Sequence, residues 1–367
     1  MGSSVLENLR GMRDFYPEEM KKTRLIFDNW RNTSIIHGFK EWDGPILETQ
    51  ALYKAKSGEE IIQQLYAFTD KGNREIALRA EMTPSLARML LKKVDSLPRP
   101  IKWFNIARCF RYERPSQGRL REFFQWNVDY LGEEQGLPDA EVMACACESI
   151  SKFGLPRNAF NLCINDRTIT IDLFKTLNIP EERYEGVFGV IDKAKKVEGD
   201  VLIKLFSDLG LQKNEIETIK EYLECTKIDE ATQFAKAHSI ESFQSIETIL
   251  NYLDWFGYSD VSRYDPTIVR GLAYYTGAVF EIYAENKSGL QRAICGGGRY
   301  DNLLSMLGGD RLPACGFGLG DPVLSLLLQD YDLLNNVDSE LDYYIPFYFF
   351  CFIYYTKYTL IPLFRNI

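Results

Sequence analysis

The chain has 367 residues, of which 46% are hydrophobic and 26% charged, and its formal net charge at pH 7 is -9. This length and balance suit one large or two ordinary soluble domains and exclude a disordered, collagen-like or membrane-bundle protein. Because acidic residues outnumber basic ones, any contact with nucleic acid must come from a local basic patch.

Metal-binding and nucleophilic residue types are sparse in this chain. The cysteines form no CxxC pair, and the two histidines, His37 and His238, have unremarkable sequence surroundings. We therefore expect neither a zinc site nor a catalytic triad built on histidine. Residues 1–10 lack the apolar core of a secretion signal, which favours a cytoplasmic protein, with an organelle as the alternative.

The first 165 residues alternate between helical and extended patterns. The Pro-Glu-Glu run that begins at residue 17 predicts a helix over 17–36, and Pro84 opens another that runs to about residue 93. Two extended runs, 101–112 and 123–131, predict a long antiparallel hairpin with its turn at 114–118. The other predicted elements are a loop over 48–56, a helix over 58–68, strands over 76–78 and 160–164, and a helix over 139–151.

Residues 166–255 differ in character, because Lys and Glu are dense, Gly is sparse and apolar residues recur at helical spacing. We interpret this region as a helical insertion. Extended patterns return over 268–283 and at 293–295, and a glycine-rich strand over 316–320 leads into an apolar helix over 323–328. Strands on both sides of a helical segment, without regular alternation, predict an α+β fold with a mostly antiparallel sheet.

The predicted organisation divides the chain into four parts, which are 1–165, 166–255, 256–330 and 331–367. The last part is an atypical apolar tail, in which residues 343–355 read YYIPFYFFCFIYY without a charge. This run is shorter than the roughly 20 residues that a membrane helix needs, and two prolines interrupt the region. We expect a buried or misassembled β-rich tail and no contact with a membrane.

Arginines gather around the predicted hairpin turn of an otherwise acidic chain. They are Arg108, Arg111, Arg114, Arg119 and Arg121. Alternation along a strand would place Arg111 and Glu113 on one face. Guanidinium groups on a rigid sheet can hold several phosphate oxygens at once, so the cluster predicts a phosphate site. A solvated, charged hairpin is the alternative.

Two further segments combine polar groups with apolar surroundings. Gln125, Asn127 and Asp129 share one strand face, where Gln125 and Asp129 can accept hydrogen bonds from an ammonium or imidazole group. Arg270 lies in an otherwise apolar run and is followed by two tyrosines. A buried arginine needs either a ligand or a core carboxylate. The glycines at 296–298 allow close approach to a ligand or mark a bulge.

Six ordered segments resemble one enzyme family. FRYERPSQGRLREFFQW (110–126) resembles motif two of class II aminoacyl-tRNA synthetases. VRGLAYYTGAVFE (269–281) together with CGGGRYDNLL (295–304) resembles the signature segments of histidyl-tRNA synthetases. The matching order and spacing extend to RGMRDFYPEE (10–19), to GPILET around Pro45 and to LRAEMTPSLAR (78–88). The resemblance covers about residues 8–328.

The resemblance implies a class II antiparallel sheet flanked by helices, in a homodimer that forms through residues 39–48. It implies two reactions: histidine and ATP with Mg²⁺ give histidyl-adenylate, and the histidyl group is then transferred to tRNA(His). Positioning and cationic stabilisation, which such chemistry needs, agree with the arginine-rich pattern.

The resemblance also implies roles for individual residues. The two catalytic residues would be Arg111, which grips the α-phosphate, and Arg270, which lies opposite it. Glu113 would contact the adenine side of ATP, and Arg119 would contact the outer phosphates, beside Arg111. The implied histidine-binding residues are Glu81, Thr83, Arg111, Gln125, Asp129, Arg270, Tyr274 and Tyr275.

The sequence departs from the family pattern at several positions, which are Ala80, Met82, Asp129, Ala273 and Pro322. Pro322 stands where motif three has an arginine that reaches ATP. Beyond residue 328 the family continues into an anticodon-binding domain that the tail does not resemble, so a truncated or misread gene end is expected. The alternative function is a non-catalytic, histidine-sensing regulatory subunit of ATP phosphoribosyltransferase. The arginines at 111, 119 and 270 favour the enzyme.

Overall fold

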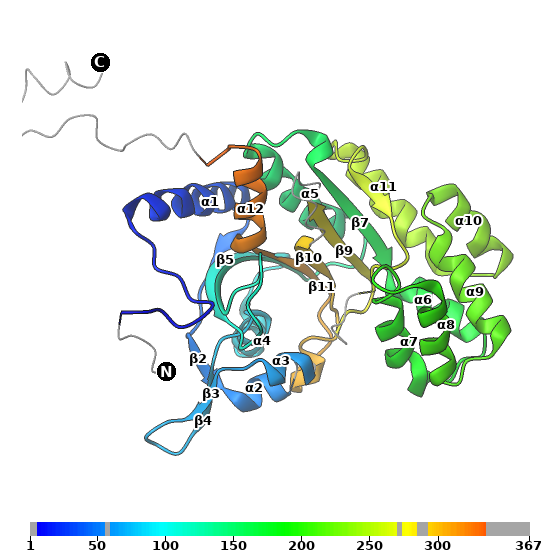
Figure 1. The fold of residues 1–367 in the computed structure, drawn as a ribbon, viewed down its shortest axis with the longest axis horizontal. Helices are drawn as coiled ribbons and strands as arrows, with labels where there is room; N and C mark the ends of the chain where they lie inside the picture. Colours follow the sequence, from blue (N-terminus) through cyan, green and yellow to red (C-terminus); the bar gives the residue numbers. More distant parts are fainter. Residues whose placement is uncertain (1–5, 56–58, 270–273, 285–292, 335–367) are drawn as a thin grey trace, which may run out of the picture. The chain divides into compact units, whose positions relative to one another are not determined.

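The computed structural model describes residues 6–55, 59–269, 274–284 and 293–334 (Figure 1). An eight-stranded sheet forms its centre, and the strand pairs are antiparallel except at the two edges. In spatial order the strands are β1 (Lys40–Glu41), β5 (Ile101–Phe110), β6 (Glu122–Leu131), β11 (Ala314–Gly320), β10 (Ala293–Arg299), β9 (Ala278–Ala284), β7 (Phe160–Asp166) and β8 (Ser262–Tyr264). This sheet and its flanking helices confirm the predicted α+β class.

Three helices pack against the central strands. They are α1 (Pro17–Ile36), α5 (Leu137–Lys152) and α12 (Asp321–Asp330). Helix α5 contacts β6, β10 and β11, and α1 contacts α5 and β5. The indole of Trp126 on β6 stacks on Trp30 of α1, with ring centroids 5.9 Å apart, and its Nε1 donates to Ser34 Oγ. Trp126 therefore faces the helices, and the predicted site residues Gln125 and Asp129, which alternate with it along β6, face the opposite side of the sheet.

A second, smaller sheet has three strands, whose spatial order is β2 (Leu47–Thr49), β4 (Glu75–Leu78) and β3 (Ala67–Thr69). The helices around it are α2 (Gln50–Lys54), α3 (Glu59–Gln63) and α4 (Thr83–Leu91), and a 3₁₀ turn, η1 (Val94–Ser96), follows. Here the predicted loop over 48–56 was wrong, because it contains α2. The predicted helix over 58–68 was too long, because Ala67 pairs with Ala77 in the sheet.

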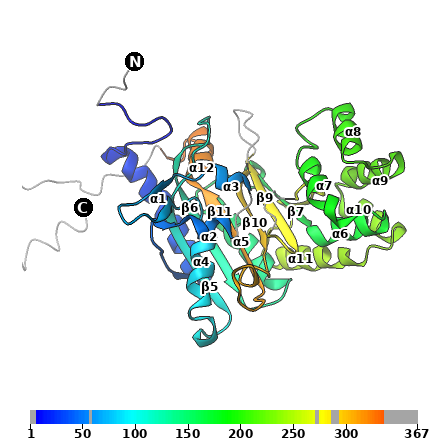
Figure 2. The same cartoon turned by 90° about the horizontal axis from the view of Figure 1, so that it is seen from below.

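Between β7 and β8 the chain forms a group of helices that Figure 2 shows beside one edge of the large sheet. They are α6 (Arg167–Thr176), α7 (Tyr184–Ile191), α8 (Gly199–Asp208), α9 (Lys213–Glu224), α10 (Ile228–Ala237) and α11 (Gln244–Trp255). The apolar positions of α9, Ile216, Ile219, Tyr222 and Leu223, are all buried. Helix α11 packs on α5 and β7. The short turns η2 (Arg157–Ala159), η3 (Glu181–Arg183), η4 (Glu241–Phe243) and η5 (Ser305–Leu307) complete the described elements.

The hairpin of β5 and β6 forms as predicted, with pairs from Ile101 and Leu131 to Phe110 and Glu122. Its connection is longer than expected, because residues 111–121 belong to neither strand. Strand alternation therefore does not explain where the arginines of this connection point. The predicted extended run over 268–283 is likewise shorter, since β9 begins only at Ala278.

Across the described part of the chain, no helix combines the length and the apolar character needed to cross a membrane. The aromatic run at 343–355 lies outside the described residues.

Candidate functional site

A cavity of about 390 Å³ lies on the face of the large sheet opposite Trp126. Its lining includes every predicted site residue that the structure describes: Glu81, Thr83, Arg111, Glu113, Arg119, Gln125, Asp129, Tyr274 and Tyr275. These residues come from α4, β6, the hairpin connection and the segment before β9. The fold thus brings together side chains that are far apart in the sequence.

The floor of the cavity is glycine. A Cβ atom on Gly316 would lie 2.4 Å from the Tyr300 hydroxyl, and one on Gly318 would lie 2.5 Å from Gln125 Nε2. Real Cβ atoms do not approach neighbours so closely, so any larger residue here would displace the side chains that line the cavity. Glycine keeps the space open and lets a ligand approach the strand backbone.

The arginines of the hairpin divide into two groups. Arg111 and Arg119 line the cavity. Arg111 Nε donates to the carbonyl of Ala80 at 3.1 Å, and Arg119 Nε lies 3.1 Å from Glu113 Oε2. In contrast, Arg108 pairs with Glu122 at 2.7 Å. Of the five arginines from which the sequence predicts a phosphate site, Arg111 and Arg119 thus line the cavity, where a carbonyl and a carboxylate orient them.

The start of α4 is fixed by apolar packing. Leu86 and Leu90 of this helix are fully buried in a cluster with Ile101 of β5 and with Leu303 and Leu304, which follow β10. Thr83, the first residue of α4, and Glu81, two residues earlier, are thereby held at the cavity.

Tyr300 is a cavity residue that sequence reasoning missed. Its hydroxyl donates to Asp129 Oδ1, and both residues are buried. Burial and the nearby Asp129 carboxylate raise the pKa of Tyr300 well above its ordinary value. Its ring packs near those of Tyr274 and Tyr275, with centroids 5.9 and 6.4 Å away. Tyr300 lies within the segment CGGGRYDNLL, but only the fold places it on Asp129.

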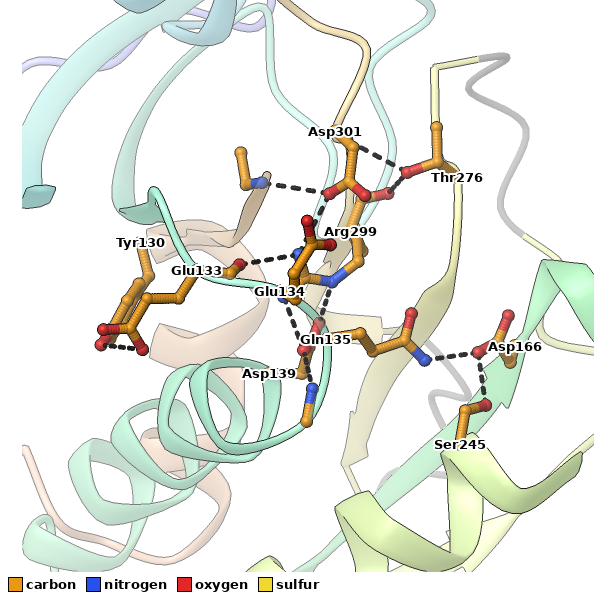
Figure 3. A network of polar contacts seen from close by, with 12 residues as sticks. Tyr130, Glu133, Glu134, Gln135, Asp139, Asp166, Ser245, Thr276, Arg299 and Asp301 are labelled. Atoms are coloured by element: carbon orange, nitrogen blue, oxygen red, sulfur yellow. Dashed lines mark hydrogen bonds and ion pairs between the residues drawn. The ribbon is translucent and has the colours of Figure 1, made fainter. Parts of the chain in front are cut away.

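A buried ion network supports this tyrosine cluster (Figure 3). Arg299 is 1% exposed, and its guanidinium donates to Asp139 at 2.7 and 3.0 Å and to Asp301 at 3.0 Å. The amide of Asp301 donates to Thr276 Oγ1, and the amide of Thr276 donates to the Arg299 carbonyl. The residues on both sides of Tyr300, and the one after Tyr275, are therefore held to α5.

A second cavity, of about 560 Å³, shares Arg111, Glu113 and Arg119 with the first and extends past them. Pro322 and Lys196 of the insertion line it as well. Lys196 pairs with Asp192 at 3.0 Å, and Asp192 lines the first cavity. Sequence reasoning did not assign these insertion residues, or Glu281 of β9, to the site.

The acidic residue at the start of α12 is structural. Asp321 accepts hydrogen bonds from the Phe124 amide at 2.7 Å and from Arg13 at 2.8 Å, and it is 2% exposed. Burial raises the pKa of Asp321, and Arg13 opposes that rise. The adjacent Pro322 supplies no charge.

Arg270 and Ala273 lie outside the described residues, so their predicted places cannot be compared with the cavity. Within the described part of the chain, no group of three or more His, Cys, Asp or Glu side chains is arranged to hold a metal ion.

Comparison with known proteins decides the family. The model of the histidyl-tRNA synthetase family matches residues 11–320. The chain belongs to the histidyl-tRNA synthetase family. Within this family, the chloroplastic/mitochondrial histidine–tRNA ligase of Arabidopsis thaliana is 40% identical over 333 residues, which are 91% of this chain and 68% of that protein.

Solved structures share the fold. The histidyl-tRNA synthetase from Nostoc sp. PCC 7120 is 23% identical, with a TM-score of 0.77 over 90% of this chain and 77% of that one. An ATP phosphoribosyltransferase regulatory subunit/histidyl-tRNA synthetase from Bacillus halodurans C is 24% identical, with a TM-score of 0.76 over 90% and 84% of the two chains. The class II synthetase sheet expected from the sequence is confirmed.

Proposed function

We propose that this chain is a histidine–tRNA ligase, which activates histidine with ATP and transfers the histidyl group to tRNA(His). The observation that carries the proposal is the single cavity lined by the predicted histidine-binding and ATP-binding residues. The cavity combines two arginines, several carboxylates and an aromatic wall. Such a cavity can bind a cationic amino acid and a polyphosphate side by side.

The histidine end of the cavity is assigned to Asp129, Gln125 and the tyrosines. The Tyr300 hydroxyl donates to one oxygen of Asp129, which fixes the orientation of the carboxylate. Asp129 and Gln125 can then accept N–H groups of the substrate, and Glu81 can accept from its ammonium. Tyr274 and Tyr275 supply the flat wall that an imidazole ring needs.

The phosphate end is assigned to Arg111 and Arg119. A carboxylate oxygen of histidine attacks the α-phosphorus of ATP, the bond to the bridging oxygen breaks, and pyrophosphate leaves. Arg111 stabilises the charge that develops on the α-phosphate, and Arg119 binds the departing end. Glu113, which lines the same cavity, is assigned to the adenine side of ATP. Mg²⁺ would enter with ATP as part of the substrate and would neutralise phosphate charge.

The second reaction is transfer. The terminal ribose hydroxyl of tRNA(His) attacks the carbonyl carbon of the adenylate, and AMP leaves. The proposed working unit is a homodimer that forms through residues 39–48, and the proposed location is the cytoplasm, with an organelle as the alternative.

A histidine-sensing regulatory subunit of ATP phosphoribosyltransferase is the second candidate function. The uncharged Pro322 at the second cavity favours it. Arg111 and Arg119 in the first cavity favour the ligase, because a sensor has no reacting phosphorus to stabilise.

Exchange between pyrophosphate and ATP, measured with the purified chain, separates the two functions. The ligase predicts exchange that depends on histidine and that other amino acids do not support. Histidine binding without any exchange would contradict the ligase and support the regulatory subunit.

A further inference from the structure

Arg167, the first residue of α6, joins the helical insertion to the chain beside the cavity. Its side chain is almost fully buried, although it carries a charge. Nη1 donates to the carbonyl of Val269 at 3.0 Å, and the Arg167 amide donates to the carbonyl of Gly277 at 3.0 Å. One residue thus holds two points of the chain that bracket Tyr274 and Tyr275.

The same guanidinium contacts the insertion. It lies 4.0 Å from the ring centre of Phe188 on α7, and Nη2 is 3.4 Å from Glu185 Oε1. Burial lowers the pKa of Arg167, and the nearby Glu185 and Tyr275 oppose that effect. Tyr275 is one of the two adjacent tyrosines that line the cavity.

Further side-chain contacts hold the segment 265–269, to which Arg167 also binds. Asn165 Nδ2 donates to the carbonyls of Pro266 and Ile268, each at 3.1 Å. Lys195 of the insertion pairs with Asp265. Residues 265–269 are thus held by side chains from β7 and the insertion, and Arg167 provides the last contact of this series.

We propose that Arg167 is a positioning residue for the histidine end of the cavity, through which helix α7 of the insertion sets the place of Tyr274 and Tyr275. The inference rests on the proposed function, because it assigns these tyrosines to histidine binding. An arginine suits this role, since its planar fork reaches a carbonyl, a carboxylate and an aromatic face together.

The test compares Arg167→Met and Arg167→Lys with the wild-type chain in histidine-dependent ATP–pyrophosphate exchange. For Arg167→Met we expect the histidine KM to rise at least fivefold while the ATP KM stays within twofold. Arg167→Lys keeps one donor for the Val269 carbonyl, so its histidine KM should lie between those of the wild-type chain and Arg167→Met. Amide hydrogen exchange of peptides covering 265–269 should be faster in both variants, in the same order.

Arg183→Met is the matched control, because Arg183 also donates to a carbonyl, that of Gly210 at 2.9 Å, but within the insertion. It should leave both KM values and the amide exchange unchanged. An unchanged histidine KM in Arg167→Met, or an equal rise in both KM values, would overturn the proposal. If the methionine variant does not fold, the lysine variant decides, and a wild-type histidine KM there overturns the proposal.

Failure of the proposed function gives a different result. A wild-type chain that binds histidine without ATP–pyrophosphate exchange is no ligase, and calorimetric titration with histidine then tests the inference. A Kd at least fivefold weaker in Arg167→Met would support the positioning role, and an equal Kd would overturn it. A wild-type chain that binds no histidine would overturn both.

Discussion

Arg111 and Arg108 are three residues apart in the sequence, yet only Arg111 lines the first cavity. Arg108 ends in an ion pair with Glu122 and lies over the ring of Phe124. Arg111 follows the last residue of β5, where the strand has ended, and its guanidinium is oriented by the Ala80 carbonyl. The same residue type therefore has a structural role at one position and a proposed catalytic role at the other.

Arg111→Ala should lower kcat for histidine-dependent ATP–pyrophosphate exchange by about a hundredfold. Loss of one oriented donor at a developing charge costs about 3 kcal/mol in the transition state. Arg108→Ala is the control and should retain exchange within a few-fold of wild type. Equal activity of the two variants would remove Arg111 from the catalytic role.

Tyr300→Phe should destabilise the protein because Asp129 loses a buried donor. A hydrogen bond to a charged group contributes about 1.5–3 kcal/mol, and we expect the free energy of unfolding to fall by that amount. Urea denaturation at pH 7 measures it. Tyr16→Phe, at an exposed residue, should leave the unfolding free energy unchanged, and an unchanged value for Tyr300→Phe would contradict the role given to the bond.

At the scale of elements, the glycines of β10 and β11 make the floor of the cavity. The two strands pair from Cys295 and Leu319 to Arg299 and Cys315, and glycine faces glycine at two of these pairs, Gly296 with Gly318 and Gly298 with Gly316. Strand interiors normally exclude glycine because it weakens them. Here the close approach of neighbouring groups leaves no room for a side chain.

Gly297→Ala tests how tightly the two strands pack, at a glycine that pairs with Phe317 next to the residues of the cavity floor. The added Cβ would lie 2.2 Å from the carbonyl oxygen of Gly316, which belongs to the backbone and cannot move cheaply. We expect a loss of about 1–3 kcal/mol in unfolding free energy, as for other overpacked cores. Gly189→Ala, in α7 with no atom within 4 Å of the new Cβ, should instead stabilise by about 0.5–1 kcal/mol. A stabilising Gly297→Ala would show that the packing against Phe280 and the Gly316 carbonyl has spare room.

At the scale of the whole molecule, polar contacts connect parts that are distant in sequence. His37, at the end of α1, lies 2.7 Å from Glu148 of α5. Lys102 of β5 lies 2.5 Å from Glu141 of α5. These contacts join the first helix, the hairpin and α5, which also carries Asp139 of the Arg299 network near its start.

Glu141 makes stability depend on pH. Burial alone would raise its pKa, but His37, whose Nδ1 lies 3.9 Å away, and the hydrogen bond from Lys102 lower the pKa below the ordinary value of 4.5. A group whose pKa is lowered by folding stabilises the fold above its unfolded pKa, and this stabilisation is lost as the pH falls through the folded pKa.

Glu141→Gln should therefore lower the free energy of unfolding by about 1 kcal/mol at pH 7, a modest value because solvent still reaches the pair. The difference from wild type should shrink as the pH falls below about 4.5. Denaturation curves at pH 7, 5 and 4 measure it, with Glu182→Gln at an exposed residue as the control. A difference that grows toward low pH would contradict the assignment.

Much of the fold was predictable because local patterns decided it. The helix over 17–36, the paired strands of the hairpin and the strand before α12 follow from periodicity and from turn residues that act over a few positions. The failures lie where pairing partners are remote. The segment 67–69 is a strand because it pairs with β4. Its own residues fit the end of a helix equally well.

The sequence by itself determined the family, because the motifs are recognised from their residues and their order along the chain, without their positions in space. Only the tertiary structure decided which arginines enter the cavity, that Tyr300 donates to Asp129, and that Arg13 neutralises Asp321. These contacts join residues from distant parts of the chain, and the physical reason is that burial and hydrogen bonding depend on which strands and helices meet. No local pattern encodes the link from Arg167 to Val269, because it exists only after the insertion has packed against β7.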